Sequence, residues 1–188
     1  MSAVIRHYSS ILIIFVHPYP HRSIVNRRLI DEIAGMDGIQ INDLYEHYPD
    51  FHIDIPREQE LLKQADLVIL QHPIYWYSAP ALLKQWQDQV LEYGFAYGSG
   101  GTALHGKGLQ NAITTGHSQQ AYCPQGEDRY TVREMLRPFE QTAYHCGMEY
   151  QQPFVIHSAH KLSVDALDEH VANYRRLLQQ YLGGDDHG

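Results

Sequence analysis

The most constraining feature of this sequence is its alternation between short β-branched runs and stretches of helical period. The runs Ile11–Val16 and Ala65–Gln71 are apolar almost throughout, which is typical of strands covered on both faces. Three further runs are expected to be strands: Ile39–Leu44, Gln110–Thr115 and Phe154–His157. Between them, apolar residues recur at helical spacing over Ser23–Ile33, Pro56–Gln64, Ser78–Leu91, Thr131–Cys146 and Val164–Leu182. This order predicts a parallel sheet with helices on both faces.

A chain of 188 residues has the length of one domain. For five parallel strands at this length we expect the doubly wound, flavodoxin-like α/β arrangement, which has three layers and the strand order 2-1-3-4-5. The domain is predicted to span residues 11–182. A weakly patterned lead-in at 1–10 precedes it, and a flexible, glycine-containing tail at 183–188 follows it.

The composition excludes several classes of partner. Lys and Arg number 14, and Asp and Glu number 22, so the formal charge is −8, which disfavours nucleic acid and anionic lipid. The longest early apolar run, Ile11–Val16, is too short to span a bilayer, so direct membrane insertion is not expected. The two cysteines, Cys123 and Cys146, form no CxxC pair, which favours a reducing, cytoplasmic location.

Histidine is unusually frequent, with 13 residues. With ordinary pKa values, roughly ten of these side chains would be charged at pH 6, which would cancel the net charge of −8. Their spacing does not support a metal site. His17 and His21 are four residues apart, but two of the residues between them are prolines, which prevent a helical turn. We therefore predict no metal centre.

A ligand of an open parallel sheet binds beyond the carboxyl ends of the strands, where the strand order reverses. In this chain that point is surrounded by the segments that follow the first, third and fourth strands: His17–Ser23, His72–Ser78 and Thr114–His117. The same segments are the richest in aromatic, His and hydroxyl residues. The coincidence of place and composition predicts the binding site.

The first of these segments leads into a helix, and a helix N-terminus attracts phosphate. Ser23 would add a hydroxyl, Asn26 an amide and His17 an imidazole N–H. The pattern GxxxxGK[ST] is missing from the sequence, so we expect a single phosphate monoester and no nucleoside triphosphate. The alternative is that Ser23 only caps the helix, a position that Ser often takes.

The other two segments suit a flat ring. Tyr75, Trp76 and Tyr77 follow a buried strand and are placed to line one edge of such a ring. Packing in the core or in an interface is an equally good interpretation of Trp76 or Tyr77. The segment Thr114–Gly116 ends a strand with a glycine, which lets backbone N–H groups approach a ring carbonyl. Trp86, by contrast, has helical spacing with apolar neighbours and is predicted to lie in the core.

Six stretches carry a resemblance to a known family: His17-Pro…Ser23-x-x-Asn26, Asp43-Leu-Tyr-x-x-Tyr-Pro-Asp-Phe-x-Ile-Asp-Ile55, Gln71-His-Pro-x-x-Trp-Tyr-Ser78, Pro80-Ala-Leu-Leu-Lys-x-Trp86, Gly94-Phe-Ala-Tyr97 and Thr114-Thr-Gly116. The Trp and Thr-Thr-Gly stretches resemble the flavodoxin-like NAD(P)H:quinone reductase family. The stretch with Tyr-Pro-Asp-Phe-x-Ile-Asp is similar to one branch of it, the ancillary proteins of glutathione-regulated potassium-efflux systems of Gram-negative bacteria. The resemblance extends from about Ile11 to Leu182.

The resemblance implies a non-covalently bound flavin, usually FMN in short members, with FAD the less expected form. NAD(P)H would give a hydride to the flavin and leave, and a quinone would then take the electrons from the same face. The family is homodimeric, and each flavin site is completed at the subunit interface. Carried over by position, three groups would hold the phosphate, the isoalloxazine and its pyrimidine side, respectively: His17, Ser23, Ile24, Val25 and Asn26; Ile74, Tyr75, Trp76 and Tyr77; Thr114, Thr115, Gly116 and His117.

Two residues beyond the third segment bear on the chemistry. Tyr122 matches a Tyr that mammalian-type quinone reductases use in charge transfer, so the resemblance makes it the candidate catalytic residue. Asp128 stands where those enzymes have a His. A carboxylate would not stabilise a reduced, anionic flavin as an imidazolium would.

Two functions are therefore expected. The first is an FMN-dependent NAD(P)H dehydrogenase (quinone). The second is a regulatory subunit that binds and activates a glutathione-regulated potassium/proton antiporter, with little catalytic role. The second function would bring the protein to the inner membrane through its partner, because the sequence shows no basic helix able to lie on a bilayer.

Overall fold

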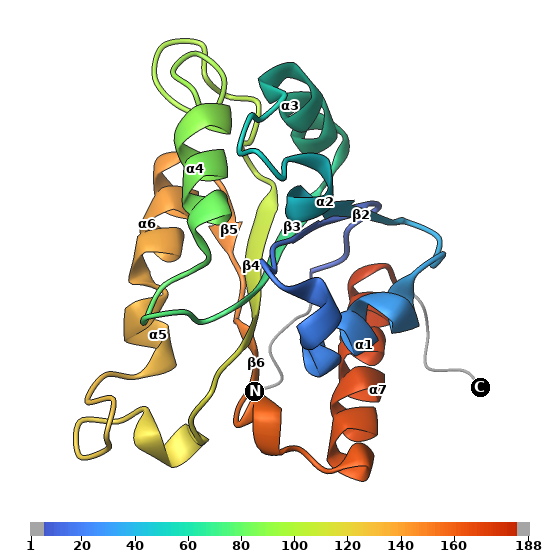
Figure 1. The fold of residues 1–188 in the computed structure, drawn as a ribbon. Helices are drawn as coiled ribbons and strands as arrows, with labels where there is room; N and C mark the ends of the chain where they lie inside the picture. Colours follow the sequence, from blue (N-terminus) through green and yellow to red (C-terminus); the bar gives the residue numbers. More distant parts are fainter. Residues whose placement is uncertain (1–5, 184–188) are drawn as a thin grey trace.

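The computed structural model describes residues 6–183. At its centre lies a six-stranded parallel sheet with the order β2-β1-β3-β4-β5, and β6 also pairs with β4 (Figure 1). The strands are β1 (Ile11–Phe15), β2 (Ile39–Asp43), β3 (Leu67–Pro73), β4 (Gly108–Thr114), β5 (Glu149–Tyr150) and β6 (Phe154–Ile156). The predicted flavodoxin-like strand order is confirmed.

One edge of the sheet differs from the prediction. β5 pairs with the start of β4 and β6 pairs with its end, so two short strands share the place expected for one strand, Phe154–His157. Pro153 immediately precedes β6 and lacks the N–H that a continuous ladder needs. The sequence analysis therefore missed β5.

Helices cover both faces of this sheet, as Figure 1 shows. α1 and α7 pack together on one face, and α3, α4 and α6 lie on the other. Their bounds are α1 (Ile24–Ile33), α3 (Ile55–Gln64), α4 (Ala81–Val90), α6 (Arg137–His145) and α7 (Val164–Tyr181). The shorter pieces are α2 (Leu44–His47), α5 (Val132–Met135) and the 3-10 turns η1 (Pro20–Arg22), η2 (Gln119–Ala121) and η3 (Ala159–Lys161).

The apolar character of β1 follows from this double coverage. Leu12 and Ile14 belong to the core beneath α3, α4 and α6, whereas Ile13 and Phe15 belong to the core beneath α1 and α7. All the residues of β1 and β3 are buried, as predicted for strands without a solvent face.

Two helices begin or end differently from the prediction. The stretch Thr131–Cys146 forms α5 and α6, which meet at Leu136, because Pro138 has no N–H for the carbonyl four residues earlier. The stretch Ser78–Leu91 starts as a helix only at Ala81, after Pro80. Ser78 therefore lies outside the helix, and it closes a tight turn described below. The sequence analysis also missed α2, whose first N–H groups are capped by the preceding carboxylate of β2.

A buried carboxylate fixes the segment between β2 and α3. Glu58 is fully buried and accepts hydrogen bonds from Asn42 Nδ2 and Tyr48 Oη, each at 2.7 Å. Trp86 Nε1 donates to the same carboxylate at 2.8 Å, and the Arg57 guanidinium lies 2.5 Å from it. The core position predicted for Trp86 is confirmed. We call these five residues the Glu58 cluster.

Candidate functional site

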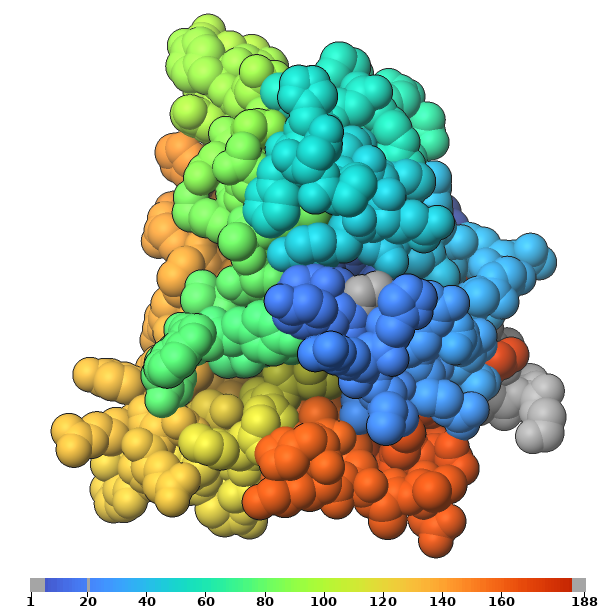
Figure 2. All heavy atoms as spheres, viewed as in Figure 1, coloured from blue at the N-terminus to red at the C-terminus, as the bar shows by residue number. Residues whose placement is uncertain are grey.

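A cavity of 360 Å³ opens at the carboxyl ends of β1, β3 and β4, where the strand order reverses. Figure 2 shows the chain segments around it, coloured blue, green and orange, meeting on one side of the molecule. Ten predicted residues from all three segments line it: His17, Ser23, Ile24, Val25, Asn26, Ile74, Tyr75, Thr114, Thr115 and Gly116. Four lining residues were not predicted: Arg22, Pro73, Ala159 and His160.

The lining residues missed in the sequence belong to three elements: Arg22 to η1, Pro73 to β3, and Ala159 and His160 to η3. Arg22 ends η1, directly before the predicted Ser23, and its guanidinium lies over the Tyr19 ring at 5.7 Å. A cation beside a predicted phosphate group is a signal that the sequence does offer. His160 lies in η3, between β6 and α7. Periodicity gives no sign of such a short turn, so nothing in the sequence pointed to it.

The start of α1 forms one end of the cavity. The N–H of Asn26 donates to Ser23 Oγ at 3.3 Å, so Ser23 does cap the helix, and its own hydroxyl hydrogen is still available to a ligand. His17 is buried, and its Nδ1 accepts a hydrogen bond from the N–H of Tyr19 at 3.1 Å. Burial lowers the pKa of His17, so the ring is neutral at pH 7 and carries its hydrogen on Nε2 as a donor.

Asn26 is the best-defined polar group at the cavity. Its side chain is 2% exposed, and Nδ2 donates to Thr114 Oγ1 at 3.0 Å. Its Oδ1 is buried and accepts no hydrogen bond within the described residues. Buried amide oxygens are normally paired, so this atom is an open acceptor beside the cavity. Gln71 Nε2 donates to the Asn26 carbonyl at 3.1 Å and helps to fix the residue.

The third segment leaves room for a ligand. Gly116 lines the cavity, and a Cβ built on it would meet no atom within 4 Å. Thr115 donates its hydroxyl hydrogen to the carbonyl of His117 at 2.9 Å, which holds the turn after β4. The backbone at Gly116 is therefore open to close approach by a flat group.

The second segment lines the cavity only in part. Ile74 and Tyr75 line the cavity, but Trp76 and Tyr77 occupy the two central positions of a turn closed by hydrogen bonds between Tyr75 and Ser78 of 2.9 and 3.0 Å. Both central residues have positive φ, 46° and 63°, a conformation usually taken by Asn and Gly. Trp76 is 92% exposed and Tyr77 53% exposed, so neither lines the cavity in this single chain.

The candidate catalytic Tyr122 lies between two imidazoles. Its ring centroid is 6.4 Å from that of His117 and 5.6 Å from that of His157. Burial raises the pKa of Tyr122, so its hydroxyl is a neutral donor at pH 7. Burial also lowers the pKa of His157, whose Nδ1 lies 3.1 Å from Thr115 Oγ1. Sequence reasoning did not select His157, because no motif or spacing links it to the other residues.

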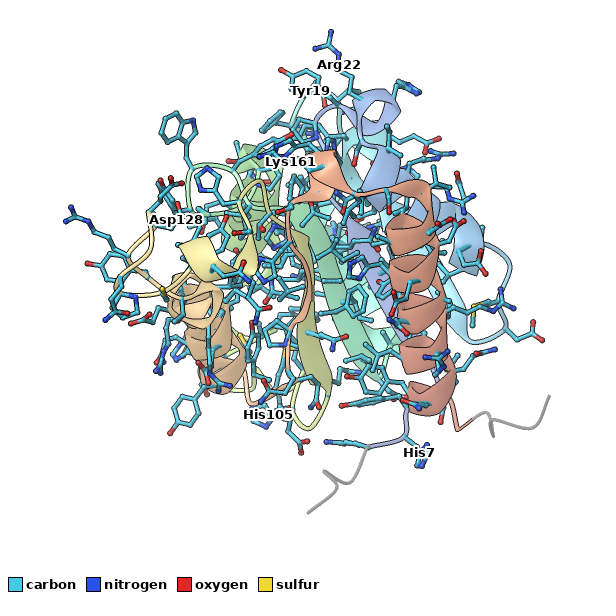
Figure 3. All side chains as sticks on the ribbon, turned by 90° about the horizontal axis from the view of Figure 1, so that it is seen from below. His7, Tyr19, Arg22, His105, Asp128 and Lys161 are labelled. Atoms are coloured by element: carbon cyan, nitrogen blue, oxygen red, sulfur yellow. The ribbon has the colours of Figure 1, made fainter. Side chains whose placement is uncertain are left out.

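His117 and Asp128 form a pair at the rim of this end. His117 does not line the cavity, and its Nδ1 lies 2.9 Å from Asp128 Oδ2. Figure 3 shows Asp128 at the same end of the molecule as Tyr19, Arg22 and Lys161, with His7 and His105 at the opposite end. The position at which the sequence analysis expected only an unfavourable carboxylate therefore holds a carboxylate joined to an imidazole.

His72 was placed by the sequence in a segment that faces a ligand, and the structure contradicts this. The residue belongs to β3 and is fully buried, with Asn111 Nδ2 3.1 Å from its Nε2 and the Pro73 carbonyl 3.0 Å from its Nδ1. Desolvation lowers the pKa of His72 to about 4. It is a neutral residue of the core, because β3 continues two residues beyond the predicted end of its strand.

Comparisons with known proteins place the chain in a family. Residues 9–181 match the model of a family described as having a flavodoxin-like fold. The glutathione-regulated potassium-efflux system ancillary protein KefG of Pectobacterium carotovorum is 45% identical over 168 residues, which are 89% of this chain and 92% of that protein. The chain therefore belongs to the flavodoxin-like family, and the resemblance to the efflux ancillary proteins is confirmed.

Solved structures agree with this assignment. General stress protein 14 of Treponema denticola, in complex with FMN, superposes with a TM-score of 0.84 at 37% identity, over 94% of this chain and 99% of that chain. An NADPH-quinone reductase from P. pentosaceus gives a TM-score of 0.82 at 34% identity, over 95% and 99% of the two chains.

Between residues 6 and 183, no helix is both long and apolar enough to cross a membrane. Over the same range, no group of three or more His, Cys, Asp and Glu side chains is arranged to hold a metal ion.

Proposed function

We propose that this protein is an FMN-dependent NAD(P)H:quinone oxidoreductase. The observation that carries the proposal is the cavity itself, which joins a helix N-terminus, the open acceptor of Asn26 and the empty space at Gly116 within one volume of 360 Å³. A phosphate, a polyol chain and a flat ring need these three kinds of environment, in that order.

The described residues fit FMN, and each would have a definite role. Ser23, Arg22 and the Nε2–H of His17 would bind the phosphate, and the Oδ1 of Asn26 would accept from a ribityl hydroxyl. Ile74 and Tyr75 would contact the ring, with its pyrimidine side near Thr115 and Gly116. When bound, the flavin supplies two-electron transfer between NAD(P)H and a quinone, and the protein positions it and excludes water.

The site would be completed by a second copy of the chain. Trp76, Tyr77 and Tyr19 are large side chains that are more than half exposed, and they belong to the segments that form the cavity. Exposed aromatic groups beside a site are typical of a subunit interface. We therefore propose a homodimer in which Trp76 and Tyr77 contact the partner or the flavin that the partner holds.

A second candidate function rests on the relatives. The name of the KefG relative describes it as an ancillary protein of a glutathione-regulated potassium-efflux system. By analogy, this chain would bind the cytoplasmic side of such an antiporter and activate it. It would then be a cytoplasmic protein that is recruited to the inner membrane by its partner. The two functions are compatible in one protein.

The flavin proposal is tested first by the absorption spectrum of the purified protein and by FMN titration of the apoprotein. We expect a yellow protein that releases FMN. The double substitution Ser23→Ala and Asn26→Ala should weaken FMN binding about 100-fold, from two hydrogen bonds of about 1.5 kcal/mol each. The same double substitution should weaken the binding of riboflavin, which lacks the phosphate, less than it weakens the binding of FMN.

A matched control separates binding from capping. Ser163 caps α7 in the same way, with the N–H of Ala166 at 3.2 Å, but it lies outside the cavity. Ser163→Ala should lower stability by about 1 kcal/mol and leave FMN affinity unchanged. Equal FMN affinity in the double variant and the wild type would refute the assignment of the phosphate site.

Stopped-flow absorbance then separates the two functions. Bleaching of the flavin by NADPH, followed by recovery of colour with a quinone, would support the enzyme. A flavoprotein that NADPH does not bleach, but that copurifies with the antiporter and activates it, would favour the regulatory function. A colourless protein that takes up no FMN would contradict both.

A further inference from the structure

The loop after η2 carries a buried carboxylate with a single imidazole partner. The Asp128 side chain is 2% exposed, and its Oδ2 lies 2.9 Å from His117 Nδ1. Among the described residues, His117 is the only cationic side chain within ion-pair distance of this carboxylate. A buried carboxylate without a partner is costly, so the pairing holds the His117 ring in place.

This contact fixes which ring nitrogen faces outward. A carboxylate only accepts hydrogen bonds, so His117 Nδ1 must donate to Asp128. Nε2 is then the free nitrogen, on a side chain that is 52% exposed. The arrangement is that of an imidazole oriented by an acid, with its second nitrogen left for chemistry.

The pair of His117 and Asp128 lies next to the wall of the cavity. His117 directly follows Gly116, which lines the cavity, and its carbonyl is held by the hydroxyl of Thr115. Tyr122 faces the His117 ring at 6.4 Å, and beyond it lies the ring of His157. Among the described residues, the other charged group within 4.0 Å of His117 is Glu127, whose exposed carboxylate lies 4.0 Å from Nδ1.

We propose that His117 is the proton donor to the quinone and that Asp128 is its positioning residue. This inference rests on the proposed oxidoreductase function. Reduction of a quinone to a hydroquinone requires two electrons and two protons. NAD(P)H supplies both electrons and one proton as a hydride, through the flavin, so a second proton has to come from elsewhere.

In the proposed step, the N–H bond at Nε2 of protonated His117 breaks and an O–H bond forms on the acceptor oxygen. Nδ1 keeps its hydrogen bond to Asp128 throughout. The ring then takes a proton from solvent, to which it is half exposed. The sum is one NAD(P)H, one quinone and one proton consumed, with one NAD(P)⁺ and one hydroquinone formed.

The first test compares two acceptors on the NADPH-reduced flavoprotein. A quinone needs the proton, whereas ferricyanide takes single electrons and needs none. In His117→Gln, we expect the rate of quinone reduction, divided by the rate of ferricyanide reduction in the same variant, to fall about 100-fold. Glu127→Gln should keep the wild-type ratio.

The second test needs no flavin. Long-range ¹H–¹⁵N correlation spectra of the apoprotein report which nitrogen of neutral His117 carries the hydrogen. We expect Nδ1–H in the wild type and in Glu127→Gln, and a large population of Nε2–H in Asp128→Asn, because the Asn amide donates as well as accepts.

The outcomes are distinguishable. Two results would overturn the proton-donor role of His117 and leave the oxidoreductase function intact. One is a wild-type His117 ring with its hydrogen on Nε2, and the other is an unchanged ratio of the two acceptor rates in a folded His117→Gln variant. If the protein binds no FMN, or if NADPH does not reduce the bound flavin, the proposed oxidoreductase function is refuted. The proton-donor role of His117 is then refuted with it.

Discussion

The Glu58 cluster and the cavity end of the sheet differ in how completely their buried polar groups are hydrogen-bonded. Glu58 is fully buried and receives three side-chain hydrogen bonds of 2.7–2.8 Å in addition to the Arg57 guanidinium. At the cavity end, Asn26 Oδ1 is buried and accepts no hydrogen bond from residues 6–183, and Asp128 pairs with one half-exposed imidazole. The backbone also differs, because Trp76 and Tyr77 both have positive φ beside the cavity.

The difference separates the groups that hold the fold from those that are available to a ligand. A fully satisfied buried carboxylate ties its segments together and leaves nothing to bind a second molecule. Open acceptors and strained turns lower stability, so their presence beside the cavity indicates function. Four predictions test this division, in order of decreasing effect.

The largest effect is expected from Glu58→Ala. The substitution leaves the buried donors of Asn42, Tyr48 and Trp86 without an acceptor and should cost about 3–5 kcal/mol in the free energy of unfolding, measured with urea. Asp31→Ala, which removes the exposed ion pair with Arg27, should cost less than about 0.5 kcal/mol. Similar losses in the two variants would contradict a scaffold role for the Glu58 cluster.

The second prediction concerns pH and the buried His72. Above pH 6.5 the ring is neutral in the folded and unfolded states, and the protein has its full stability. As the pH falls from 6.5 towards the folded pKa of about 4, only the unfolded chain takes up the proton, so the free energy of unfolding should decrease. The decrease should reach about 3 kcal/mol by pH 4.

The variant His72→Gln tests whether His72 causes this dependence of the free energy of unfolding on pH, which we call the slope. The amide can keep a hydrogen bond to Asn111 but does not titrate, so urea unfolding at pH 7 and pH 4.5 should show a smaller difference than in the wild type. His17 also has a lowered pKa and will contribute part of the remaining slope. An unchanged slope would show that acid sensitivity arises elsewhere.

The third prediction concerns the turn at the cavity. Replacing Trp76 by Asn and Tyr77 by Gly supplies the residues that positive φ favours, so stability should rise by about 1–2 kcal/mol in the thermal unfolding of the monomer. If the aromatic pair completes the site across a dimer, the same variant should lose dimer affinity, as measured by sedimentation. If the variant is less stable than the wild type as a monomer, the positive φ values of Trp76 and Tyr77 do not strain the turn.

The smallest effect on stability is expected from Asp128→Asn. Asn retains the shape and a hydrogen bond, and the half-exposed His117 can be solvated by water, so the loss should stay below about 1 kcal/mol. Compared with Glu58→Ala in the same urea assay, this tests the division directly. A loss as large as that of Glu58→Ala would make Asp128 a scaffold residue.

Most of the fold could be predicted from the sequence because burial leaves a local pattern. The unbroken apolar runs of β1 and β3 and the helical spacing in α1 and α7 each report how their own element is covered. Two of the exceptions arose at prolines: Pro138 divides a helical pattern that is otherwise continuous, and Pro153 separates β5 from β6.

The candidate site could be predicted only in part. Topology and composition indicated the three segments, and ten of the thirteen residues assigned to flavin contacts line the cavity. Trp76, Tyr77 and His117 do not, since the conformation of a turn and the partner of a side chain depend on contacts outside the segment. The cofactor roles of all thirteen residues, and the catalytic role of Tyr122, stay predictions until the flavin and the proton are measured.

The sequence by itself determined the alternating α/β order and the end of the sheet where a ligand is expected, because the period of each segment and the order of segments along the chain can be read locally. Only the tertiary structure decided which polar groups meet. It paired Asp128 with His117, set Tyr122 between His117 and His157, and gave Glu58 its donors from β2, from α4 and from the residue that follows α2. Such pairs depend on how separate elements pack and where loops turn, and the pattern of a single segment carries no record of either.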